Sequence, residues 1–141
     1  MNINLTISAV LYPTESQEKV EAAIKKLFPD VELKLEQGFG TANRLTGSTI
    51  AIEGLKKLHE LLRRQRILDT ARSTFLKNKR GNAIEFELNK QVAYIGKVNF
   101  VEEAIALGSI HVKIEAEEID RLIDWLAPVT KDGKPIQEIE L

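Results

Sequence analysis

The sequence predicts an α+β fold, a two-layer sandwich with helices packed on one face of a mixed, largely antiparallel sheet. Three observations support this prediction. Several segments alternate apolar with polar residues, as half-buried strands do. Other segments carry apolar residues every three or four positions, as amphipathic helices do. The chain has 141 residues, 43% of them hydrophobic, and we predict a single domain over residues 1–141.

The first part of the chain is predicted to form a strand, a helix and a second strand. Apolar residues alternate with polar ones over residues 3–9, which predicts the first strand. Thr14 and Gln17 have the three-residue spacing of a capping box, which predicts that a helix begins there. Pro29 ends this helix, and renewed alternation over residues 31–35 predicts the second strand. The apolar face of the helix is formed by Val20, Ala23, Ile24, Leu27 and Phe28.

Residues 37–49, QGFGTANRLTGST, are predicted to be a flexible connection, followed by a short strand near residues 49–52. The glycines at 38–47 match neither nucleotide-binding pattern, because Gly-Lys-Ser/Thr is absent and no third glycine opens a helix at the dinucleotide spacing. We therefore expect no cofactor. Arg44 remains a candidate for holding an anion beside the amides of this loop.

The second part is predicted to hold a hairpin, a strand and a closing helix. Residues 84–88 alternate, and residues 92–100 are predicted to be their partner strand after a turn at Asn89-Lys90. SIHVKIEA, residues 109–116, alternates again and predicts another strand. Residues 119–126 carry one apolar stripe, which predicts a helix that ends before Pro128.

Two apolar stripes in residues 55–75 predict a kinked or broken helix. The leucines over residues 55–62 centre on one direction of a helical wheel, and the apolar residues over 67–75 centre roughly 120° away. Because one straight helix cannot bury both stripes, we predict a kink or break close to residues 62–66. The basic side chains lie opposite the stripes, so we expect them to face solvent.

The net charge of -1 conceals a strong asymmetry. Residues 56–80 hold nine of the 20 Lys and Arg but only two of the 21 acids, Glu60 and Asp69, a net charge of +7. The rest of the chain therefore has 11 bases against 19 acids, a net charge of -8. The chain is predicted to carry a basic segment on an acidic body.

This basic segment suggests a non-enzymatic protein that binds the phosphate backbone of RNA. Lys and Arg on one face displace counterions from a polyanion, and the planar arginine group can grip phosphate with two hydrogen bonds. The simpler interpretation is a solvated helix face, in which Asp69 pairs with Arg66 or Arg72. Dense like charge costs stability, which favours an anionic partner. The candidate contacts are Arg63, Arg64, Arg66 and Arg72, supported by Lys56, Lys57, Lys77, Lys79 and Arg80.

No catalytic or metal-binding pattern is recognisable. HELLR, from His59, resembles a zinc-protease helix but has Arg63 where the second histidine must stand. His111 points away from the apolar side of its predicted strand and is expected on the surface. Asp69 beside Arg72 is the one polar cluster of interest, and a salt bridge is its simpler interpretation. With no Cys and two His, we expect neither an enzyme nor a metal protein.

The sequence contains no segment that predicts a membrane or secretory role. No apolar run approaches the roughly 20 residues of a membrane helix, and the N-terminus lacks the basic start and apolar core of a signal peptide. The absence of Cys fits a reducing compartment. A cytoplasmic protein that does not contact membranes is therefore expected.

Four stretches, in this order, resemble an archaeal family known as uncharacterised protein family 0201. They are YPTES at 12–16, LLRRQRILDTAR at 61–72, LNKQVAYIGKVNF at 88–100 and LGSIHVKI at 107–114. The resemblance implies a two-layer fold similar to the large-subunit ribosomal protein that binds 5S RNA, and an RNA-binding label. It implies no enzyme and no particular contact residues.

A protein partner is the main alternative. The basic segment is equally suited to an acidic protein surface or to the acidic body of a second copy, since +7 and -8 are complementary. A third possibility, an enzyme acting on phosphorylated small molecules at the glycine-rich loop, would require an anion near Arg44.

Overall fold

The computed structural model describes residues 1–38, 40–102 and 108–141. The strands are β1 (Ile3–Leu11), β2 (Glu32–Gln37), β3 (Asn43–Thr49), β4 (Lys79–Arg80), β5 (Ala83–Asn89), β6 (Phe100–Val101), β7 (Ser109–Ala116), β8 (Thr130–Lys131) and β9 (Lys134–Pro135). The helices are α1 (Gln17–Leu27), the 3-10 turn η1 (Ile52–Leu55), α2 (Lys56–Arg64), α3 (Leu68–Lys77), α4 (Lys90–Tyr94) and α5 (Ile119–Leu126). In these residues, no helix is both long and apolar enough to cross a bilayer.

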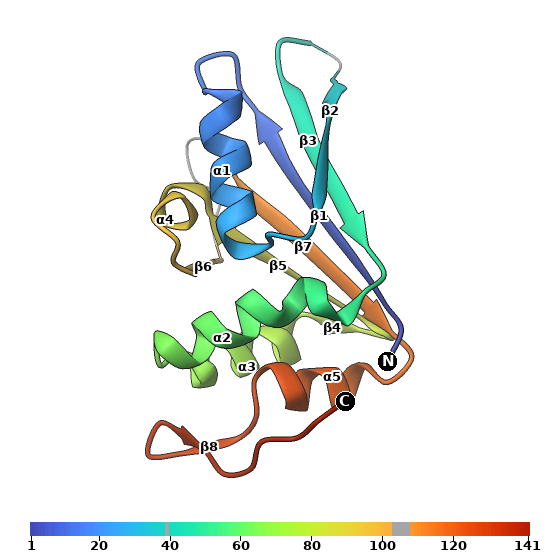
Figure 1. Cartoon of the computed structure of the whole chain (residues 1–141), viewed down its shortest axis with the longest axis vertical. Coiled ribbons are helices and arrows are strands. Elements are labelled where there is room, and N and C mark those ends of the chain that lie inside the picture. The colour runs from blue at the N-terminus through green and yellow to red at the C-terminus, as the bar shows by residue number, and fades with distance from the viewer. Residues whose placement is uncertain (39, 103–107) are drawn as a thin grey trace.

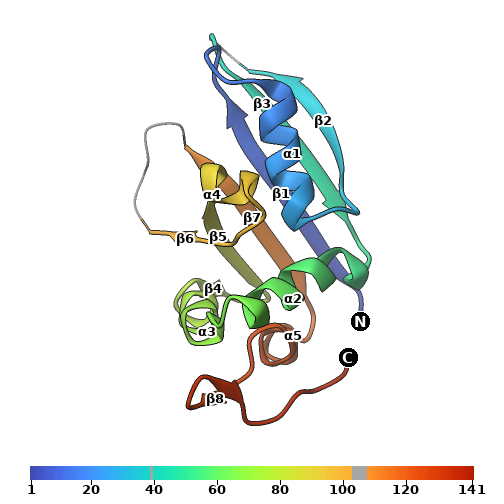
Figure 2. The same ribbon diagram turned by 60° about the vertical axis from the view of Figure 1, so that its left-hand side comes forward.

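The main sheet has the strand order β2-β3-β1-β7-β5-β4, and β6 also pairs with β5. Every pairing is antiparallel. Helices α1 and α4 pack side by side on one face, while α2, α3 and α5 gather at one end of the strands (Figure 1, Figure 2). The predicted α+β sandwich with helices on one face of a largely antiparallel sheet is confirmed.

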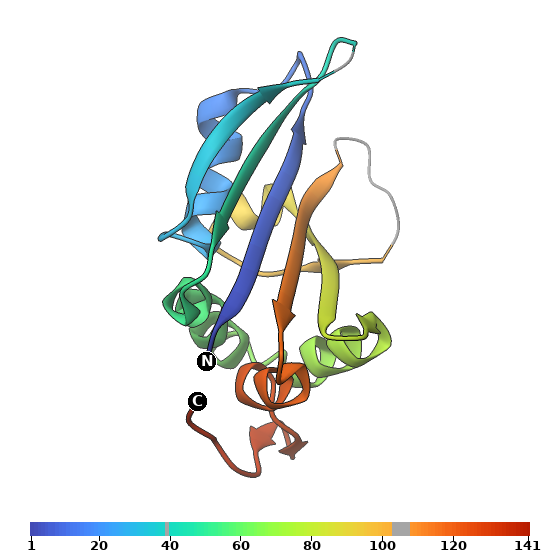
Figure 3. The same cartoon turned by 90° about the vertical axis from the view of Figure 1, so that its right-hand side faces the viewer.

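The sheet has one buried and one open face because its strands alternate in polarity. Along β1 the residues Ile3, Leu5 and Ile7 are buried, while Asn4 and Thr6 between them are exposed. β5 and β7 repeat this pattern in register with β1. Figure 3 views the face opposite α1 and α4, where the strands lie uncovered in front of these helices. Burial of the apolar side chains beneath the helices is the dominant favourable contribution to the fold.

The segment after β5 differs from the predicted hairpin. Residues 92–100 do not form one partner strand, because α4 begins at Lys90 and only β6 returns to pair with β5. The Asn89 side chain accepts a hydrogen bond of 3.0 Å from the Val92 backbone amide. This contact caps the N-terminus of α4 and satisfies an amide that a helix otherwise leaves free.

Two further predictions near the N-terminus are wrong in detail. The capping residue of α1 is Ser16, which accepts from the Lys19 amide, rather than Thr14. The glycine-rich stretch is not a loop over its whole length, since residues 43–49 form β3 against β1 and β2. Gly47 is required within β3, because a Cβ atom there would lie 2.4 Å from a Val31 methyl carbon.

The basic segment forms two helices, α2 and α3, with a break at residues 65–67. The Arg66 amide bonds to the Arg63 carbonyl, and the Ile67 amide bonds to the Leu62 carbonyl. These are the two bonds of a Schellman motif, in which the residue after the helix adopts a left-handed conformation. Arg66 takes that position with φ 57°. The two helices can therefore each turn an apolar face inward.

Candidate nucleic-acid interface

The apolar faces of α2 and α3 determine where the basic side chains lie. Helix α2 buries Leu58, Leu61 and Leu62, and helix α3 buries Ala71 and Phe75. Positions seven or eight residues apart fall on one side of a helix. Lys57 and Arg64 therefore share one side of α2, and Lys56 and Arg63 share the adjacent side. Lys56 at the start of the helix is exposed, whereas Arg63 near its end is partly buried. The exposed fractions of the Arg63 and Arg64 side chains are 19% and 61%.

Arg63 is fully engaged within the protein. Its guanidinium group makes two hydrogen bonds to the Glu138 carboxylate, at 2.7 and 2.6 Å. It also donates to the carbonyls of His59, Trp125 and Leu126, at 2.9, 3.0 and 3.1 Å. The last two carbonyls belong to the C-terminal end of α5, where a cation is favoured by the helix dipole. Arg63 thus joins α2, α5 and the C-terminal tail.

Helix α5 supplies acids to two more of the candidate residues. Arg72 lies 2.8 Å from Asp124 and donates at 3.1 Å to the Ala127 carbonyl. Lys79 lies 2.5 Å from Asp120. Asp69 does not pair with Arg66 or Arg72 as the sequence suggested, but accepts a hydrogen bond from the Thr130 hydroxyl. The expectation that the basic segment faces solvent without partners is therefore wrong for Arg63, Arg72 and Lys79.

The remaining candidates are less restrained. Lys57 and Arg64 both contact Glu60, and Lys77 lies 3.7 Å from Glu102 in a highly exposed pair. Arg80 donates to two backbone carbonyls. Lys56 and Arg66 are exposed and form no ion pair with any residue that the structure describes.

The local charge excess is smaller than the sequence count. Four carboxylates from outside residues 56–80 meet this segment, in addition to the two acids within it. Nine bases against six acids leave an excess of three rather than seven. For two of these acids the sequence contained a clue: Asp120 and Asp124 lie four residues apart and therefore on one side of α5. No comparable pattern in the sequence indicated Glu138.

Two groups beside Arg63 have shifted acidities. Burial, and then the nearby positive charge of Arg63, lower the pKa of His59 from its ordinary 6.5, and Glu138 opposes this shift. The hydrogen bond from Arg63 lowers the pKa of Glu138 from its ordinary 4.5. The His59 ring also stacks on Trp125 with a centroid distance of 4.5 Å.

Both shifts predict a loss of stability in acid. A lowered pKa in the folded state means that the unfolded chain binds more protons, so protonation favours unfolding. We expect the free energy of unfolding to fall as pH drops below 6.5, through His59, and again below 4.5, through Glu138. Urea unfolding at several pH values measures this effect. His59→Gln is expected to flatten the upper part of the profile, and an unchanged slope in that variant would contradict the assignment.

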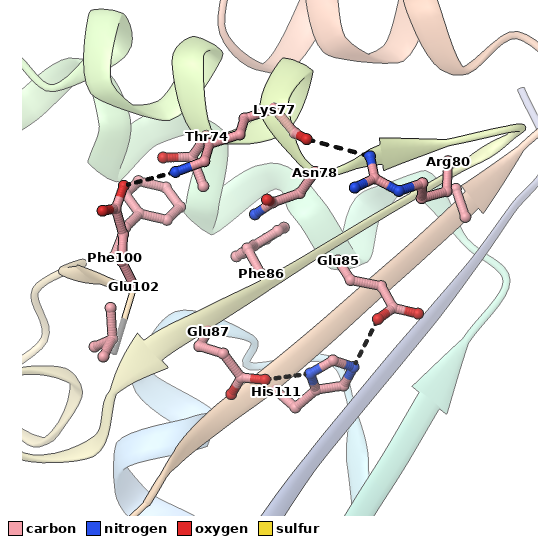
Figure 4. A pocket seen from close by; sticks show the side chains of 12 residues that line it. Thr74, Lys77, Asn78, Arg80, Glu85, Phe86, Glu87, Phe100, Glu102 and His111 are labelled. Carbon is pink, nitrogen blue, oxygen red and sulfur yellow. Dashed lines mark hydrogen bonds and ion pairs between the residues drawn. The ribbon is translucent and has the colours of Figure 1, made fainter. Parts of the chain in front are cut away.

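A cavity of about 500 Å³ lies between the end of α3 and the outer edge of β5 (Figure 4). Phe86 and Phe100 line it on the apolar side. Lys77 and Arg80 approach from α3 and β4. The opposite wall carries Glu85, Glu87 and His111, and Glu102 lies on the Lys77 side. This mixture of charges makes the cavity a poor site for a simple anion.

His111 and Ser109 both contact the carboxylate of Glu87, one of the residues that line the cavity. His111 Nδ1 lies 2.5 Å from Glu87, whose other oxygen accepts from the Ser109 hydroxyl. The serine thus bonds to the carboxylate and not to the imidazole, so this contact does not activate it as a nucleophile. Across residues 1–38, 40–102 and 108–141, no group of three or more His, Cys, Asp or Glu could hold a metal ion.

Comparisons with known proteins place the chain among archaeal relatives. A family model described as RNA binding matches residues 4–116. The chain is 46% identical over 131 residues to a UPF0201 protein of Thermococcus onnurineus, covering 93% of this chain and 96% of that protein. It is 38% identical over 141 residues to a UPF0200/UPF0201 protein of Archaeoglobus fulgidus, covering 99% of this chain but 42% of that longer protein.

A solved structure agrees with the sequence comparisons. The crystal structure of a UPF0201 protein from Methanococcus jannaschii superimposes with a TM-score of 0.87 at 40% identity, covering 95% of this chain and 99% of that chain. No enzymatic activity is named for these three relatives. The chain therefore belongs to the archaeal UPF0201 family and to the RNA-binding family that the matching model defines.

Proposed function

We propose that this protein binds RNA without catalysing a reaction, and that it contacts the phosphate backbone through the outer side of α2, the turn that follows, and basic residues at the end of α3 and in β4. The family description supports RNA as the partner. The geometry divides the nine candidates into two groups. Lys56, Lys57, Arg64, Arg66, Lys77 and Arg80 are proposed to contact RNA. Arg63, Arg72 and Lys79 are proposed to hold α5 and the tail.

The observation that carries this proposal is the backbone of Arg66. A left-handed conformation costs a residue with a Cβ atom roughly 1–2 kcal/mol, and glycine removes that cost. The chain has an arginine there, exposed at the turn between α2 and α3 and without an ion-pair partner in the described residues. Backbone strain of this kind clusters at active sites, ligand clamps and switch regions, which supports a functional role for Arg66. A cation at this turn is well placed for a phosphate.

The alternative, a basic segment that docks on an acidic protein, is weakened by the ion pairs within the chain. Arg63, Arg72 and Lys79 already meet acids of α5 and the tail. Three of the charges counted for an external acidic surface are therefore compensated internally. RNA needs only the exposed cations, because each phosphate contact contributes through counterion release.

The proposal predicts a specific change in salt dependence. The paired replacement Arg64→Glu with Arg66→Glu is expected to weaken binding to structured RNA and to reduce the slope of log affinity against log salt by roughly two, about 0.9 for each phosphate that is no longer neutralised, by analogy with duplex DNA. Fluorescence anisotropy at several salt concentrations measures both quantities. Lys131→Glu with Lys134→Glu, in the β8–β9 hairpin, makes the same charge change as a control.

Two results would contradict this proposal. One is the absence of binding to any structured RNA at low salt. The other is an equal effect of the Arg64/Arg66 and Lys131/Lys134 pairs, which would show that net charge alone governs the affinity.

A further inference from the structure

The two edges of the main sheet are unequally protected. On one side, β4 pairs with the start of β5 and β6 pairs with its end. On the other side the sheet ends at β2, a six-residue strand whose outer edge pairs with no described strand (Figure 1, Figure 3). An open edge presents unpaired backbone groups and readily accepts another strand.

Strand β2 also presents side chains that suit such an addition. Leu33 and Leu35 lie on the helix-covered face. Leu35 is 44% exposed, and no described strand pairs with the outer edge of β2. Lys34 and Glu36 lie on the open face. Behind the edge, a shallow groove between α1 and β2 is lined by Glu18, Glu21, Ala22, Lys25, Glu32 and Leu33.

The sequence of β2 is complementary to itself in one antiparallel register. With Leu35 opposite Leu35 of a second copy, Lys34 of each copy lies opposite Glu36 of the other, so two attractive cross-strand pairs form. Cross-strand partners lie on the same face, and opposite charges in such pairs stabilise a sheet. The two Leu35 side chains would cover one another. A register shifted to place Lys34 on the axis instead pairs Lys34 with itself and Glu32 with Glu36, which is repulsive.

We propose that this protein forms a two-fold symmetric dimer in which the β2 strands of two copies pair antiparallel with Leu35 on the axis. A two-fold axis perpendicular to the sheet keeps the helix-covered faces of both copies on the same side. The two sheets then join at β2 into one continuous sheet. The partner is a second copy rather than another protein because Lys34 and Glu36 complement the same strand turned around. The basic surfaces of α2 would then occur twice in each dimer, which raises avidity for a long RNA.

Charge reversal along β2 tests the register directly. Lys34→Glu alone and Glu36→Lys alone each convert both attractive pairs into repulsive ones, and each is expected to weaken the dimer roughly tenfold or more. The double variant Lys34→Glu with Glu36→Lys restores both pairs and is expected to return the dissociation constant to within about threefold of the unmodified protein. Sedimentation equilibrium measures the dissociation constant, and Lys131→Glu serves as the matched control.

Three outcomes would overturn the dimer. They are a monomer at all accessible concentrations, a dimer that neither single reversal weakens, and a double variant as weak as the singles. Tightening by Glu36→Lys would also count against it, because the introduced lysine is attracted to Glu32 of the second copy only in the shifted register. RNA binding by the monomer would survive any of these results, so the two proposals can fail separately.

Discussion

Replacement of Lys90 by Met is expected to lower the free energy of unfolding by about 3–5 kcal/mol, the usual cost of breaking a buried ion pair by removing one partner. The Lys90 side chain is 5% exposed, and its ammonium group lies 3.1 Å from the Glu15 carboxylate, itself 10% exposed. Lys90 also donates to the Val10 carbonyl at 2.5 Å. Methionine keeps most of the length of the side chain, ending one atom earlier, but leaves the carboxylate buried without this cation.

The position of this pair explains why the effect is expected to be large. Glu15 accepts from the Tyr12 amide at 3.0 Å, and the Lys90 ammonium lies 5.3 Å from the centre of the Tyr12 ring. The pair thus joins the end of β1, the turn before α1 and the first turn of α4. Two of the stretches that carry the family resemblance, at 12–16 and 88–100, meet here. Loss of this contact is therefore expected to affect three elements at once.

Urea unfolding at neutral pH measures the loss, with Lys97→Met as the control because Lys97 is exposed. A double-mutant cycle with Glu15→Gln is expected to show a coupling of about 0.5–3 kcal/mol, since residues in direct contact are not additive. A loss below about 1 kcal/mol for Lys90→Met would instead fit a surface pair and would contradict the buried one.

The strands that the sequence predicted well are those with one apolar and one polar face. β1, β5 and β7 alternate regularly, since each lies between the core and the open face. β3 was predicted as a loop because Gly47 and its polar neighbours conceal the alternation, leaving only Leu45 fully buried. β3 is held as a strand by its pairing with β1 and β2, and the residues of β3 alone do not indicate this pairing.

Short elements could not be predicted from the sequence either. Helix α4 has five residues, too few to show a helical period, and its valine and tyrosine favour a strand by propensity. The capping contact from Asn89 and the packing of α4 against α1 decide the outcome. By contrast, the apolar stripes of α2 and α3 are long enough that the sequence shows them facing different directions on a helical wheel.

The basic segment is visible in the sequence, but its internal pairing is not. Counting charges identifies the segment because its bases are adjacent in sequence. Arg63 meets Glu138 across 75 residues and Arg72 meets Asp124 across 52. Pairs at such separations depend on how α5 and the tail fold back over α2 and α3. Without the fold, a structural arginine and a binding arginine are indistinguishable.

Arg63→Met and Arg66→Gly are expected to have opposite effects on stability, which separates these two roles. Arg63→Met removes the cation from the C-terminal carbonyls of α5 and from Glu138, and is expected to lower the free energy of unfolding by about 2–3 kcal/mol. Arg66→Gly relieves the left-handed strain at φ 57°, and is expected to raise the free energy of unfolding by about 1 kcal/mol.

Of these two variants, only Arg66→Gly is expected to change the salt dependence of RNA binding. Arg66→Gly removes a proposed phosphate contact and is expected to reduce the salt slope by roughly 0.9, even though the variant is expected to be more stable. Arg63→Met is expected to leave the slope unchanged at temperatures where the variant remains folded. Urea unfolding and anisotropy on the same samples provide both quantities. The contradicting result would be an Arg63→Met variant that loses no stability but reduces the salt slope as much as Arg66→Gly does. Arg63 would then bind phosphate in place of Glu138, and its structural role would be refuted.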